Sequence, residues 1–210
     1  DANDPSTKGP AKRFVVQLPK DRTYVIEMIS SDMDPFLLLL DRSGNPLAQD
    51  DDSAGDLNAQ IIFAPEKDSE VHIIASVIRG DVGRFTLRVR EFALRGEAEP
   101  RQIGMRGHEI HARINKSHKS ELGKLGRMYS FEMKAGVTYS IDLFSRDFFS
   151  CMLNLFDSRS RLLAKHGDFD GGPSAPITFR PERDGVYHIF ATSLSGSEIG
   201  EFTLKIRPDK

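Results

Sequence analysis

The chain has 210 residues, of which 39% are hydrophobic and 29% are charged, an ordinary composition for a globular protein. A formal net charge of −2 gives no general attraction to nucleic acid or to anionic membranes. No apolar run approaches the ~20 residues of a transmembrane helix. The sequence therefore predicts no nucleic-acid partner and no membrane insertion, and its length suits two domains of about 100 residues each.

Alternating apolar and polar residues predict β-strands along the whole chain. Residues 14–18, 24–28 and 85–89 each place apolar side chains at every second position, as a half-buried antiparallel strand does. Turn residues such as Ser43-Gly44-Asn45-Pro46 separate these runs. No stretch has a sustained helical period, so we expect an all-β protein of sandwich or barrel type.

The chain also contains an internal duplication. Three pairs of segments match in the same order: 23–28 with 138–143, 61–68 with 177–184, and 83–90 with 200–207. The offset grows by one residue from each pair to the next, which single-residue insertions explain. Matches that keep their order along a whole unit indicate two copies of one domain.

The duplication predicts the domain boundaries. We expect a first domain over residues 1–95 that begins with a loosely held leader, residues 1–11. Residues 96–104 read as a linker, because the region is rich in Gly, Pro and charges. Residues 105–210 form the second domain, which opens with a strand at 108–114. Because the chain begins with Asp1 and not Met, we expect a processed protein or a fragment.

The repeated motifs resemble those of the bacterial pre-peptidase C-terminal (PPC) domain. From Phe14 to Val89 the first repeat carries Thr-Tyr-x-Ile, Asp-Pro-Phe-Leu-Leu-Leu-Leu-Asp, Gly-Asn-Pro-Leu-Ala-Gln-Asp-Asp-Asp, Ile-x-Phe-x-Pro and Gly-x-Phe-Thr-Leu. The second repeat, from Tyr129 to Ile206, carries most of this set but loses the Asp-Pro-aromatic element and dilutes the acidic run. The motifs are moderately specific as a group and weak singly.

The resemblance implies two tandem jelly-roll-like antiparallel β-sandwich domains. It also implies an exported module, periplasmic, cell-surface or secreted, that is attached to secreted proteases or other surface proteins and is not an enzyme. The related collagen-binding modules of collagenases bind calcium and a fibrous substrate.

An acidic loop in the first repeat is the sharpest local feature. Calcium takes six to eight oxygen ligands from carboxylates, amides and carbonyls. The candidate ligands are Asp50, Asp51, Asp52 and Asp56, with Asn58 beside them, and Asp32 and Asp34 in the preceding loop. The alternative is a solvated turn whose aspartates cap backbone amides. The second repeat keeps Asp168 and Asp170 but has His166 and Gly167 in place of two aspartates.

Other chemistry-bearing residues favour structural roles. His108 and His111 are three apart, so on a strand they point to opposite faces and make a poor zinc pair. His72 and His188 occupy equivalent positions opposite the presumed core face. The single cysteine, Cys151, lies in an apolar run without a nearby base, which favours a buried side chain over a nucleophile.

The sequence offers little for catalysis or for sugar binding. It has no Gly-x-Ser-x-Gly elbow and no phosphate-binding loop. It has no Trp, and its tyrosines fall at core-type positions, so exposed rings for stacking on sugars are scarce. We expect a non-catalytic binding or accessory module that recognises protein or extracellular matrix. The alternatives are a structural spacer, or an enzyme with an unrecognised site.

Overall fold

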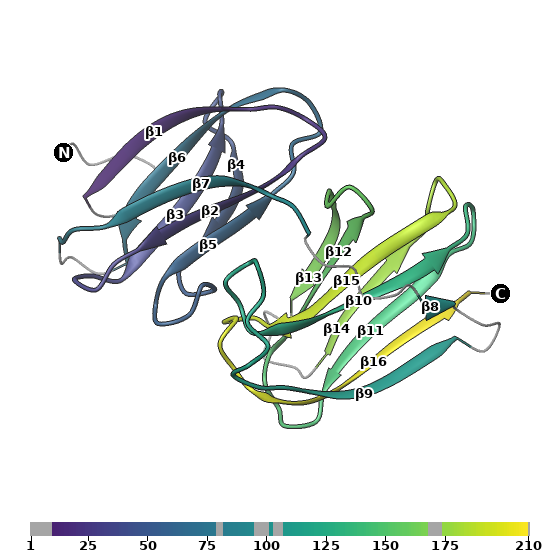
Figure 1. Ribbon diagram of the computed structural model, residues 1–210. Coiled ribbons are helices and arrows are strands. Elements are labelled where there is room, and N and C mark those ends of the chain that lie inside the picture. The colour runs from purple at the N-terminus through teal and green to yellow at the C-terminus, as the bar shows by residue number, and fades with distance from the viewer. Residues whose placement is uncertain (1–9, 79–81, 95–100, 103–106, 168–173, 210) are drawn as a thin grey trace. The chain divides into compact units, whose positions relative to one another are not determined.

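The protein is all-β, and a computed structural model describes residues 10–78, 82–94, 101–102, 107–167 and 174–209. The described residues form strands β1 to β16 and no helix (Figure 1). Within them, no helix is long and apolar enough to cross a membrane. The chain divides into two compact units, Asp1–Phe92 and Ala93–Lys210.

The first unit is a sandwich of two sheets. One sheet has the order β1-β6-β3-β4 and is formed by β1 (Ala11–Leu18), β6 (Ser69–Val77), β3 (Pro35–Asp41) and β4 (Pro46–Asp50). The other has the order β5-β2-β7 and is formed by β5 (Ala59–Phe63), β2 (Thr23–Ile29) and β7 (Thr86–Phe92). Successive strands change sheet at every connection except the β3–β4 hairpin, which gives the jelly-roll-like winding predicted from the sequence.

The second unit repeats this plan and adds two strands. One sheet has the order β13-β12-β15-β10-β8 and contains β13 (Leu162–Gly167), β12 (Cys151–Asp157), β15 (Gly185–Ser193), β10 (Gly126–Met133) and β8 (Arg101–Gln102). The other has the order β14-β11-β16-β9 and contains β14 (Ser174–Phe179), β11 (Tyr139–Ser145), β16 (Gly200–Pro208) and β9 (His108–Ile114). Strands β8 and β9 have no counterpart in the described part of the first unit.

Each sandwich buries the apolar face of both its sheets. In the first unit, Leu37, Leu39 and Ile73 of one sheet pack against Ile26 and Ile61 of the other. In the second unit, the corresponding core extends to Ile114 of the added strand β9. Strand β3 is buried on both faces, because Leu38 and Leu40 join a second apolar cluster with Ile74. An apolar run without alternation is expected for such a strand.

The two units pair their strands in the same register. Ala11 lies opposite Ser76, as Gly126 lies opposite Thr192. Tyr24 lies opposite Glu91, as Tyr139 lies opposite Pro208. The difference in residue number between equivalent positions of the two units is larger in the later strand of each pair, as the sequence repeats predict. This agreement is what an internal duplication is expected to produce.

Three sequence predictions differ from the structure in detail. The predicted leader runs too far, because β1 begins at Ala11; residues 1–9 of that leader lie outside the described residues. The predicted linker contains β8, whose Arg101 lies opposite Phe131 in β10. This pairing is parallel, so the sheets are not purely antiparallel. A two-residue strand has no sequence period, which is why the alternation did not reveal it.

Candidate functional site

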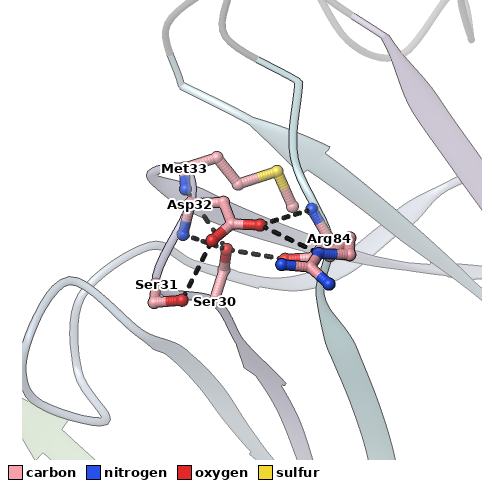
Figure 2. A network of polar contacts seen from close by, with 5 residues as sticks. All are labelled: Ser30, Ser31, Asp32, Met33 and Arg84. Carbon is pink, nitrogen blue, oxygen red and sulfur yellow. Dashed lines mark hydrogen bonds and ion pairs between the residues drawn. The ribbon is translucent and has the colours of Figure 1, made fainter.

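The turn after β2 is tied to the residues before β7 by a polar network (Figure 2). The Asp32 carboxylate Oδ2 accepts hydrogen bonds from the backbone N of Arg84 at 3.3 Å and from its Nε at 3.4 Å. The Ser30 hydroxyl donates to the carbonyl oxygen of Arg84 at 2.8 Å and accepts from the backbone N of Met33 at 3.2 Å. Asp32, a candidate calcium ligand, therefore serves as a clamp between the two strands.

The second unit keeps the same clamp. Asp147 Oδ2 accepts from the backbone N of Glu201 at 2.8 Å. The preceding glycines make the close approach possible: a Cβ at Gly83 would lie 2.6 Å from the Cβ of Asp32, and one at Gly200 would lie 2.9 Å from the Phe149 ring. This contact explains why both repeats carry a glycine at the start of the Gly-x-Phe-Thr-Leu motif.

The clamp predicts a pH dependence. Hydrogen bonds from Ser31, then from Arg84, lower the pKa of Asp32. A carboxyl whose folded pKa lies below its unfolded pKa adds stability above the unfolded pKa, and this is lost as pH falls through the folded pKa. We expect the unfolding free energy of the first unit to fall more gently below about pH 4 in D32N than in the wild type. Chemical denaturation at a series of pH values measures this; parallel curves would contradict it.

The acidic loop is held by hydrogen bonds within the protein. Asp50 lies at the end of β4, and its Oδ2 accepts from the backbone N of Ser53 at 3.1 Å and of Gln60 at 2.7 Å. The loop meets the turn after β2 through Asn58, whose Oδ1 accepts from the backbone N of Ser30 at 3.0 Å. The two loops thus approach each other as the calcium hypothesis requires, but an amide makes the junction.

The structure does not gather the predicted carboxylates around one point. Among the described residues, no group of three or more His, Cys, Asp or Glu side chains is placed to hold a metal ion. Calcium can also use backbone carbonyls, so binding at Asp50, Asp51, Asp52, Asp56, Asp32 and Asp34 stays a prediction. The second repeat's Asp168 and Asp170 lie outside the described residues.

The histidines and the cysteine have structural surroundings. On β9, His108 stacks edge-on against Phe131 at 5.8 Å, whereas His111 bonds the Thr203 hydroxyl at 3.0 Å, so the two point to opposite faces as predicted. His188 is buried opposite the core and bonds Ser130 at 2.9 Å. Cys151 is fully buried in the core.

An apolar pocket opens at one end of the first sandwich. Its volume is about 120 Å³. Apolar cavities of ~150 Å³ bind molecules of the size of benzene. The lining residues that matter here are Met28, Met33, Phe85, Val82 and Lys12. Val82 is 71% exposed at the mouth, so a large apolar group on a partner has direct access. No sequence pattern singled out this pocket, because its walls come from four separate segments.

The pocket lies where the edges of the two sheets face each other. Phe14 of β1 meets Phe85, just before β7, at a ring distance of 6.5 Å, and the Lys12 ammonium lies 5.9 Å from the centre of the Phe85 ring. The second unit has the equivalent ring pair, Tyr129 with Phe202, at 6.4 Å. That pair is buried, at 5% and 0% exposure, whereas Phe14 and Phe85 are only half-buried.

Strand β9 accounts for this difference. It pairs with β16, the counterpart of β7, and places Ile114 opposite Gly200 (Figure 1). Ile114 is fully buried in the second core, with Ile110 and Ala112 packed beside it. In the described part of the first unit β7 pairs with β2 alone. Among the described residues of the first unit, no strand therefore occupies the edge that β9 covers in the second unit.

A second concavity, of about 430 Å³, lies on the β14-β11-β16 sheet and is polar. Its side chains bond one another: the Ser140 hydroxyl donates to Asp209 at 2.8 Å, and Arg207 pairs with Asp142 at 3.6 Å. Because these groups already satisfy each other, this surface is a weaker candidate than the apolar pocket.

Comparison with protein-family models gives no match, and comparison with curated protein sequences gives none either. Among solved structures, the pre-peptidase C-terminal domain of a Bacillus anthracis collagenase aligns at 14% identity and a TM-score of 0.41, covering 54% of this chain and 100% of that domain.

Two further solved structures align over most of this chain. The M60 catalytic domain with CBM51-1 and CBM51-2 from Clostridium perfringens ZmpB aligns at 8% identity and a TM-score of 0.32, over 94% of this chain and 33% of that one. The CUB1-EGF-CUB2 region of human MASP-1/3 aligns at 11% and 0.30, over 95% and 93%. At these identities and TM-scores, none of the three assigns a function to this chain.

Proposed function

We propose that this protein is a non-catalytic binding module that recognises a protein or matrix partner through the open edge of its first unit. The observation that carries the proposal is the apolar pocket, with Met28 and Met33 in its wall beside the half-buried Phe85. Large apolar side chains that enter pockets dominate the energetics of protein interfaces. Methionine-rich walls adapt to the shape of such anchors.

The motif resemblance extends this proposal to family and location. We propose that both units are divergent PPC-type domains and that the chain is exported as an accessory part of a larger protein. The Gly-x-Phe-Thr-Leu motif supports a common origin of the two units, because in both the residue after its glycine donates its backbone N–H to the same kind of aspartate clamp. Detection of the parent protein outside the cytoplasm would support export, and its exclusive presence in the cytoplasm would overturn it.

A displayed peptide library tests the binding role. The full chain should enrich peptides with a large apolar anchor, and V82D should abolish their binding by placing a charge at the pocket mouth. The matched control is I199D, because Ile199 is the counterpart of Val82 and is also exposed, at 46%. A purely structural spacer is the alternative. It predicts no enrichment, or binding that V82D leaves unchanged.

Calcium at the acidic loop is a separate proposal. In chelator, D50A should lower the unfolding free energy by about 1–3 kcal/mol, because it strands the Gln60 backbone donor. D51A should stay within about 0.5 kcal/mol. If calcium binds, calcium at about 100 times its dissociation constant adds ~2.7 kcal/mol to the wild type, and D51A reduces this gain. Calorimetry and thermal unfolding in calcium and in chelator measure both; the absence of heat and of a shift would overturn calcium binding.

A further inference from the structure

We propose that the partner adds an extended strand to the free edge of β7, antiparallel to it, and that this strand is acidic on its outward face. The inference rests on the proposed function and specifies how the partner binds. Addition of a strand to a sheet edge supplies backbone hydrogen bonds for affinity and side-chain pockets for specificity. The second unit of this chain displays the geometry, because β9 occupies the equivalent edge of β16.

The register of β9 places the partner's apolar residues. Ile114 lies opposite Gly200, Ala112 opposite Phe202, and Ile110 opposite Leu204. The counterparts of these three β16 residues in the first unit are Gly83, Phe85 and Leu87. A strand added in the same register therefore directs the side chain at the position of Ile114, the last residue of β9, toward Gly83 and Phe85, which line the pocket. This side chain takes the role that Ile114 has in the second core.

The outward face of β9 shows which charges such a strand needs. Glu109 pairs with Lys205 at 3.4 Å, and Arg113 pairs with Glu201 at 3.9 Å. The first unit replaces Lys205 with Arg88 and Glu201 with Arg84, so both facing positions are basic. Arg88 is exposed and lies opposite Glu27 of β2, whose carboxylate pairs with Arg90 at 3.6 Å.

The positive charges of Arg84 and Lys12 also favour an acidic partner strand. Arg84 is 96% exposed along its side chain despite its contact with Asp32. Lys12, at the pocket wall, pairs with no carboxylate of the described residues and lies over the Phe85 ring. Acidic residues opposite Arg84 and Arg88 therefore complement this edge, whereas the β9 sequence itself would place Arg113 against Arg84. The charges select an acidic partner strand over exchange of β9 between copies of the chain.

The test uses the full chain, labelled with ¹⁵N, and a heptapeptide with the β9 sequence carrying R113E. We expect saturable amide shifts along residues 83–89, with a dissociation constant that R88E weakens about tenfold or more through like-charge repulsion. K205E is the matched control, since Lys205 is the counterpart of Arg88 in the second unit; it should leave the affinity unchanged. Amide spectra of every variant verify that both units remain folded.

Two further peptides separate the possible outcomes. A peptide with proline at the positions of both His111 and Ala112 lacks a donor for strand pairing, because the amides of adjacent residues point to opposite sides of a strand. If it binds as tightly, or if shifts avoid residues 83–89, strand addition is overturned while a pocket-binding module survives. If the unmodified β9 peptide binds as tightly as the acidic one, the acidic selection is overturned in favour of exchange between copies. If no peptide binds, strand addition fails, and the library selection with V82D still decides the proposed function by itself.

Discussion

Replacement of Phe202 by alanine should lower the unfolding free energy of the second unit by about 3–5 kcal/mol. The ring is fully buried and meets Tyr129 edge-on at 6.4 Å. The strands on both sides of β16 hold it, so little collapse around the cavity is expected. In the first unit, F85A removes the equivalent ring from a half-buried site and should cost less than about half as much.

Urea unfolding of the full chain, followed through amide signals assigned to each unit, measures both costs separately. The two rings occupy the same place in the repeat, so the difference isolates the cover that β9 provides. Equal costs for F85A and F202A would mean that the first edge is covered as well as the second, which would contradict the open edge.

Ile114 should be the most sensitive position of the added strand. I114A should cost the second unit about 2–5 kcal/mol, because it deletes most of a fully buried side chain and leaves a cavity beneath β9. The neighbouring R113A is the control. Arg113 pairs with Glu201 across 3.9 Å, and both side chains are more than half exposed. Such surface pairs contribute about 0–1 kcal/mol.

The same urea titration measures this pair of variants, and hydrogen exchange adds a second readout. If I114A has no larger effect than R113A, β9 is not part of the second core. The comparison between the two units would then no longer support the inference that the edge of β7 has no second neighbour among the described residues.

The sequence predicted the architecture well because it carries two clear patterns, the alternation of apolar and polar residues and the internal duplication. The alternation in 85–89 and 202–206 marks half-buried strands, and the ordered repeats fix which strands correspond. The segment 108–114 was predicted as a strand and is β9, with the bounds expected. Strand β8 was missed because two residues carry no period, and its parallel pairing is set by a distant strand.

The site was far less predictable. The aspartates of the two loops were predicted as calcium ligands. In the structure, the carboxylates of Asp32 and Asp50 accept hydrogen bonds from backbone N–H groups. Sequence alone cannot separate these roles, since capping and calcium binding need the same carboxylate in the same kind of turn. The open edge was missed because it is a difference between the two units. It becomes visible only when β16 is seen to pair with both β11 and β9, whereas β7, among the described residues, pairs with β2 alone.

The central claim is that β7 is an edge strand whereas β16 is covered on both sides, and residue-resolved amide hydrogen exchange on the full chain tests it most directly. The account predicts slow exchange at every amide from Glu201 to Lys205, which lie between β11 and β9. It predicts alternation along residues 86–89, with fast exchange at the amides that point away from β2. Uniform slow exchange along residues 86–89 in the absence of any partner would contradict it.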